Sequence, residues 1–77
     1  MQKILQDKSI GKNLQRIRKE HNMSQRDVVI QLELRGRVMH QATYAKIELG
    51  QGNIFVSDLV LLREIFDVDY NEFFKGL

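Results

Sequence analysis

The side chains of this chain that are able to do chemistry are amides and cations rather than nucleophiles. The sequence has no cysteine, and its two histidines, His21 and His40, have no obvious acid or base partner and are too few for a structural zinc site. The three serines precede stretches of helical spacing, where serine serves as a helix cap: Ser9, Ser24 and Ser57. Because a glycine-rich phosphate loop is also missing, we expect no enzymatic activity, no metal and no cofactor.

Charge is distributed unevenly along the chain. Residues 1 to 50 hold ten lysines and arginines against five acidic residues, a net charge of +5, whereas residues 51 to 77 hold two against five, a net charge of −3. A basic half suits a polyanion such as nucleic acid. The alternative is that these cations only solvate helix surfaces, and the charge by itself does not separate the two interpretations.

The length of 77 residues predicts a single domain, with its core at about residues 9 to 74. No disulfide can support so small a core, so helix packing or self-association must hold it together. No apolar run approaches the roughly 20 residues that span a bilayer, and no targeting segment is recognisable. We therefore expect a soluble, cytoplasmic protein that has no contact with a membrane.

Apolar residues recur at helical spacing, which predicts an all-α fold of five helices. Ser9 is predicted to cap the first helix, which ends at His21-Asn22. Ser24 is predicted to cap the second, with Asp27 in its first turn near the positive end of the helix dipole. The segment Arg35-Gly36-Arg37 should interrupt that helix.

The second half of the chain continues the helical pattern. A third helix is expected over residues 40 to 49, ended by Gly50 in the left-handed conformation. Ser57 is predicted to cap a fourth helix, and Asp69 with Glu72 resembles the capping box of a short fifth.

Four short motifs follow one another in an order typical of one family: Arg18, Ser24-Gln25, Ile47-Glu48-x-Gly50 and Asp67-Val68-Asp69. Together with the five helices, they resemble the lambda-repressor-like helix-turn-helix proteins over about residues 9 to 74. The resemblance implies a sequence-specific regulator of transcription, a repressor, that binds double-stranded DNA. The connection around residues 33 to 38 is longer than the tight turn that the family usually has between its second and third helices.

In the resembled family the third helix reads the major groove. If Tyr44 and Ile47 face the core, the helical period turns four residues toward the base edges: Gln41, Ala42, Ala45 and Lys46. Gln41 is favoured for direct readout because an amide can bind adenine through two hydrogen bonds, and the alternative is a solvated glutamine. The two alanines either approach a thymine methyl group or are present only because alanine favours a helix. Lys46 either contacts a base or a phosphate or is solvated.

Four further residues are candidates for the DNA backbone. In the family, the glutamine that matches Gln25 contacts a phosphate at the start of the second helix. The alternative is that Gln25 has no role in binding and simply follows the cap residue. Arg35 and Arg37 flank a glycine in the lengthened turn, where they grip a phosphate or are solvated. His40 reaches a phosphate or merely begins the third helix.

Arg18 and Glu48 match a pair that the family joins as a salt bridge behind the recognition helix. Their predicted role is therefore structural.

The chain end is rich in apolar side chains: Tyr70, Phe73, Phe74 and Leu77. Part of this segment must close the core, and the remainder suits a two-fold interface, since the family commonly binds DNA as a homodimer. The rival interpretation is a protein-interaction or antitoxin-like module, with the same fold facing an acidic protein partner. The sequence leaves open whether a further C-terminal domain belongs to the protein.

Overall fold

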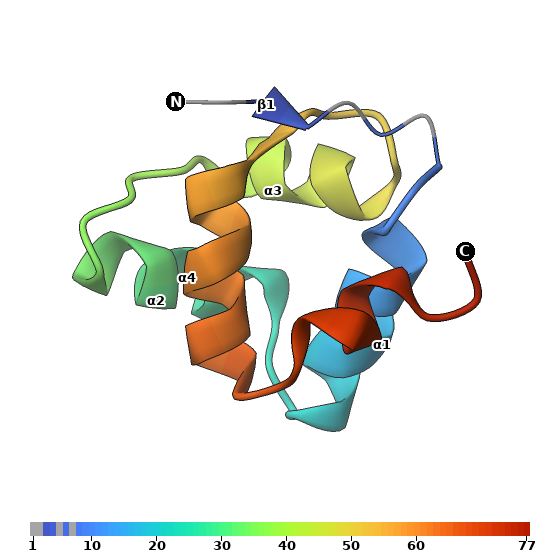
Figure 1. Ribbon diagram of the computed structural model, residues 1–77. Helices are drawn as coiled ribbons and strands as arrows, with labels where there is room; N and C mark the ends of the chain where they lie inside the picture. Colours follow the sequence, from blue (N-terminus) through green and yellow to red (C-terminus); the bar gives the residue numbers. More distant parts are fainter. Residues whose placement is uncertain (1–2, 5, 7) are drawn as a thin grey trace.

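The computed structural model describes residues 3–4, 6 and 8–77. These residues form four α-helices: α1 (Gly11–Glu20), α2 (Gln25–Leu34), α3 (Gln41–Glu48) and α4 (Val56–Phe66). A 3-10 helix, η1 (Tyr70–Phe74), follows α4, and the strands β1 (Lys3–Ile4) and β2 (Ile54–Phe55) pair antiparallel. In Figure 1, α4 crosses the middle of the view, with α2 on one side, α1 and η1 on the other, and α3 above. The all-α prediction of five α-helices is therefore wrong in its last helix and omits the strand pair.

η1 is not the predicted α-helix because side chains of α1 bind its backbone. Asn13 Nδ2 donates a hydrogen bond to the carbonyl of Phe73 at 2.9 Å, and Arg16 Nη2 donates to the carbonyl of Glu72 at 3.3 Å. The Glu72 carboxylate lies 3.5 Å from Arg16, while the Asp69 side chain makes no cap hydrogen bond. Since carbonyls that are bound by α1 need no intrahelical partner, the chain can leave the helix after one short turn.

Two of the predicted N-caps are misplaced. α1 begins at Gly11, and Ser9 Oγ accepts the Gly11 N–H at 2.9 Å from just outside the cap position. α4 begins directly after β2, because Asp58 in its first turn accepts the Phe55 N–H at 3.2 Å. Ser57 therefore lies inside the first turn of α4 rather than at its cap.

The other helix boundaries agree with the prediction. Ser24 and Asp27 form a reciprocal capping box, with bonds of 2.8 and 3.0 Å, and the hydrogen bond from the Ser24 backbone lowers the pKa of Asp27. Gly36 after α2 and Gly50 after α3 both adopt a positive φ, +89° and +77°. These turns need glycine because a Cβ atom is strained in that conformation.

All four α-helices bury an apolar face in one core. The largest fully buried side chains are Tyr44, Phe66 and Phe73, from α3, α4 and η1. On α4, Leu59, Leu62 and Phe66 are buried, whereas Ile65 is only half-buried. In the part of the chain that the structure describes, no helix is long and apolar enough to cross a membrane.

Candidate nucleic-acid interface

The outward face of α3 carries the residues that were predicted to face base edges. Tyr44 and Ile47 are buried, which turns the opposite side of the helix to the surface. The four predicted residues lie there as the exposed Gln41, Ala42 and Lys46 and the half-buried Ala45. An amide, a methyl group and an ammonium group are thus presented on one helix, which is of a size that enters the major groove.

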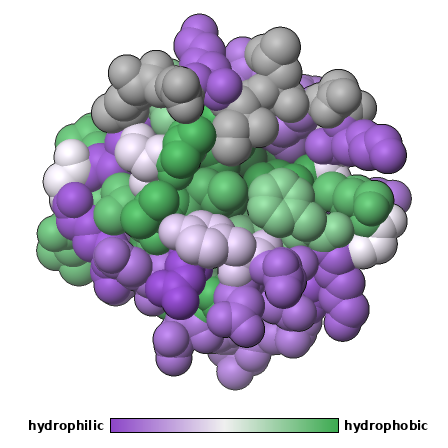
Figure 2. Space-filling model, in the orientation of Figure 1, coloured by the Kyte–Doolittle hydropathy of each residue, from purple (hydrophilic) through white to green (hydrophobic). Residues whose placement is uncertain are grey.

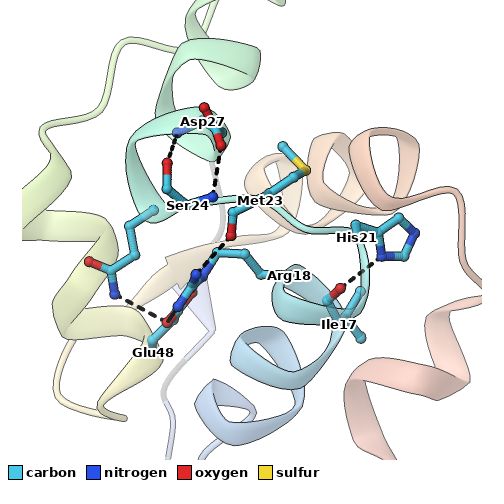
Figure 3. A network of polar contacts seen from close by, with 8 residues as sticks. Ile17, Arg18, His21, Met23, Ser24, Asp27 and Glu48 are labelled. Atoms are coloured by element: carbon cyan, nitrogen blue, oxygen red, sulfur yellow. Dashed lines mark hydrogen bonds and ion pairs between the residues drawn. The ribbon is translucent and has the colours of Figure 1, made fainter.

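α3 is held against α1 by a buried ion pair, drawn in Figure 3. Arg18 Nε and Nη2 donate to the two carboxylate oxygens of Glu48 at 2.7 and 3.0 Å, and the two side chains are 9% and 3% exposed. Arg18 Nη1 also donates to the Met23 carbonyl at 2.9 Å. The hydrogen bond to Glu48 raises the pKa of Arg18. Because the contact is bidentate, it sets both the distance and the orientation between the two helices.

Gln25, the first residue of α2, joins the same cluster. Its Nε2 donates to Glu48 Oε1 at 3.1 Å, and its side chain is half-buried. A primary amide carries two protons, and this bond uses one of them. The second is the one that a phosphate at the N-terminus of α2 would accept, where the helix dipole favours an anion. The phosphate contact of Gln25 stays a prediction.

Arg35 and His40 lie exposed at the two ends of the connection between α2 and α3. Arg35 Nη1 donates to the Gln31 side chain at 2.8 Å, and its Nε lies 3.8 Å from Glu64 of α4. Surface contacts of this kind are worth little, so a phosphate can compete for Arg35. His40 is the N-cap residue of α3, and its side chain makes no cap hydrogen bond. Both remain candidates for the DNA backbone.

Arg37, the second arginine of the lengthened turn, has a protein partner that was not predicted. Its Nε donates to Asp58 Oδ1 at 2.7 Å and its Nη1 to the Val38 carbonyl at 2.9 Å. Asp58 is 1% exposed, whereas the side chain of Arg37 is 28% exposed. Arg37 is therefore bound to an internal carboxylate, and its predicted phosphate contact stays a prediction. No local pattern indicated this pair, because the partner comes from α4, 21 residues further along the chain.

Two residues of this region were missed by the sequence analysis. Leu49 is 70% exposed directly after α3, and the helical period relates it to Ala42 and Lys46, which is the signal that could have found it. Gly11 lies where α1 meets α3, and a Cβ atom there would overlap the Glu48 carbonyl. Its signal is a glycine in the first turn of a predicted helix, where a close backbone approach is one explanation.

The described residues contain no group of three or more metal-binding side chains. Among families of known proteins, the model described as Helix-turn-helix matches residues 14–73, which is most of the chain. Comparisons with curated proteins and with solved structures gave no match. The matched residues include α2, α3 and the connection between them, as well as Arg18 and Glu48. The chain therefore belongs to the lambda-repressor-like helix-turn-helix family of DNA-binding proteins.

Proposed function

We propose that this protein binds a specific double-stranded DNA sequence and acts as a transcriptional repressor, with α3 in the major groove. The observation that carries the proposal is the exposed face of α3, on a helix whose other face is anchored by Tyr44 and by the Arg18–Glu48 pair. A helix that is held rigidly can present its side chains to base edges at little entropic cost. We propose no catalytic activity.

In this arrangement each residue has a separate task. Gln41 reads a base, Ala42 allows the helix to approach a thymine methyl, and Lys46 reaches a base or a phosphate. Gln25 and Arg35 contact phosphates, which fixes the register on the duplex without reading its sequence.

Replacing Gln41 with alanine should relax the preference for one base, because a bidentate contact to adenine is worth about 1 to 3 kcal/mol of discrimination. The measurement is selection of bound duplexes from a random library at about physiological salt. We expect a palindromic motif for the wild type that loses an adenine in Gln41→Ala. Gln15→Ala, the same change at an exposed position of α1, is the matched control and should leave the motif intact. An unchanged motif in Gln41→Ala would remove base reading from Gln41.

The DNA-bound form should be a homodimer. Figure 2 shows apolar side chains gathered across the face formed by α4 and η1. The exposed apolar residues of these elements and the chain end are Val56, Val60, Tyr70, Phe74 and Leu77. An apolar patch beyond what the core needs suits a two-fold contact, which would place two copies of α3 on successive half-sites.

Replacing Phe74, which is 45% exposed, with serine should weaken the dimer while the fold persists. Sedimentation with and without the selected duplex measures this. The control is Leu34→Ser, because Leu34 is 74% exposed and lies at the end of α2. Monomers alone at high concentration, with and without DNA, would exclude the homodimer.

The second candidate function is a module that binds an acidic protein. This function is favoured by two exposed apolar side chains beside the lengthened turn, Leu34 at 74% and Val38 at 68%. Apolar side chains gain nothing from contact with a phosphate backbone, whereas they can pack against a protein. Salt dependence alone would not separate the two functions, whereas a library selection that yields no motif would favour the protein partner.

A further inference from the structure

The connection between α2 and α3 begins with backbone hydrogen bonds to the last turn of α2. The N–H of Gly36 donates to the Glu33 carbonyl and that of Arg37 to the Leu32 carbonyl, both at 2.9 Å. With Gly36 at a positive φ, this is the Schellman arrangement that ends a helix. The chain direction up to Arg37 is therefore determined locally, by α2.

Beyond Arg37 the direction is determined by α4. Arg37 Nε donates to Asp58 Oδ1 at 2.7 Å, and Asp58 Oδ2 accepts the Phe55 N–H at 3.2 Å, so both oxygens of this buried carboxylate are used. The guanidinium carbon of Arg37 also lies 5.8 Å from the centre of the Phe55 ring, within range of a cation–π contact. Two contacts of Arg37 thus join the turn to the start of α4, and Asp58 is itself held by the Phe55 backbone.

The segment that follows Arg37 leads directly into α3. Met39 is buried in the core, His40 is the N-cap, and Gln41 begins the helix. Only Val38 lies between the Arg37 anchor and the Met39 anchor. A shift of Arg37 would therefore move the backbone just before the first turn of α3.

We propose that the Arg37–Asp58 ion pair positions the first turn of α3 on DNA, so that both residues control base discrimination without touching the duplex. This inference rests on the proposed function of sequence-specific DNA binding. Arg37 and Asp58 are positioning residues, and they act through the geometry of Gln41 and Ala42.

The two roles available to Arg37 make opposite predictions. A phosphate ligand contributes to counterion release, so its loss lowers the salt slope of binding by about 0.9 and weakens all sequences alike. A positioning residue leaves the slope unchanged and lowers the preference for the right bases. Asp58 sharpens the contrast, because removing a negative charge near DNA should strengthen binding if charge alone matters.

The experiment compares Arg37→Met, Asp58→Asn and the double variant with the wild type. Affinities are measured over a range of salt for the selected duplex and for its single-base variants. We expect both single variants to lose about tenfold in base discrimination, the scale of one bidentate base contact, with an unchanged salt slope. The double variant should lose no more than either single variant, since the same contact is removed. Arg35→Met, the control, should lower the slope and keep the discrimination.

A lowered slope in Arg37→Met, or tighter binding with full discrimination in Asp58→Asn, would overturn the inference. Circular dichroism identifies a temperature at which the variants are folded, and binding is measured there. If Asp58→Asn does not fold, the comparison of Arg37→Met with Arg35→Met still distinguishes a positioning residue from a phosphate ligand. A wild type that selects no motif overturns the proposed function and this inference with it. A wild-type motif that both single variants read with full discrimination overturns the inference alone.

Discussion

Replacing Gly11 with alanine should lower the melting temperature strongly, and by more than the same change at Gly36. A Cβ atom at this position would overlap the Glu48 carbonyl and lie 2.8 Å from the Ile47 carbonyl oxygen. Both obstacles are backbone atoms near the end of α3, so no flexible side chain can yield. To relieve the overlap, α1 and α3 would have to separate, which also stretches the Arg18–Glu48 pair.

The expected cost of Gly11→Ala is about 3 kcal/mol, at the upper end of the usual range for overpacking. For a chain of this size the whole stability is about 4 to 12 kcal/mol, and the melting temperature should fall by roughly 12 to 24 °C. Thermal unfolding followed by circular dichroism measures this. Gly36→Ala is the control, because Gly36 has a positive φ but open space around it, and should cost only about 1 to 2 kcal/mol. Equal melting temperatures for Gly11→Ala and Gly36→Ala would contradict the close approach of α1 to α3.

Replacing Arg18 with methionine should cost about 3 to 5 kcal/mol, because it leaves the buried carboxylate of Glu48 without its cation. The double variant Arg18→Met/Glu48→Met should recover most of this loss, since an apolar pair needs no compensation. Arg16→Met is the matched change at exposed pairs with Glu20 and Glu72, where the side chains are 36%, 59% and 39% exposed, and it should cost less than about 1 kcal/mol per pair. Urea unfolding measures all three, and a cost for Arg18→Met no larger than for Arg16→Met would contradict the prediction.

The same variants should differ in their response to pH. Burial raises the pKa of Glu48, but the hydrogen bonds from Arg18 and Gln25 and the charge of Arg18 lower it by more, so the pKa lies below its ordinary value. A folded-state pKa that is lowered contributes stability above the unfolded pKa, and this stability is lost as the pH falls through the folded value. In Arg18→Met both effects of Arg18 are lost, and burial, the largest cause, outweighs the hydrogen bond from Gln25, so the pKa of Glu48 is raised instead. Acid should therefore narrow the difference in stability between this variant and the wild type. A gap of constant size from neutral to acid pH would count against this account.

Local signals in the sequence predicted most of the helical framework. The Ser24–Asp27 capping box, the helix end at Gly36 and the buried faces marked by Tyr44 and Ile47 all depend on neighbours within a few residues. Helical geometry places such neighbours in contact whatever the rest of the chain does. The same spacing predicted which side of α3 is exposed, and hence most of the candidate interface.

The errors arose where a side chain or a backbone carbonyl finds a distant partner. Ser57 was a plausible cap by local rules, but β1 pairs with β2 and Asp58 binds Phe55, so α4 begins earlier. The predicted fifth α-helix is a 3-10 helix because Asn13 and Arg16, about sixty residues earlier, donate to the carbonyls of Phe73 and Glu72.

What the sequence determined by itself is therefore the four α-helices, their inward faces and the basic character of the half that contains α2 and α3. Only the tertiary structure decided that Arg37 binds Asp58, that Gln25 donates a hydrogen bond to Glu48, and that Gly11 lets the backbones of α1 and α3 touch. The physical reason is range. A hydrogen bond within a helix or its cap follows from chain geometry, whereas a bond between helices exists only after packing has chosen which surfaces meet.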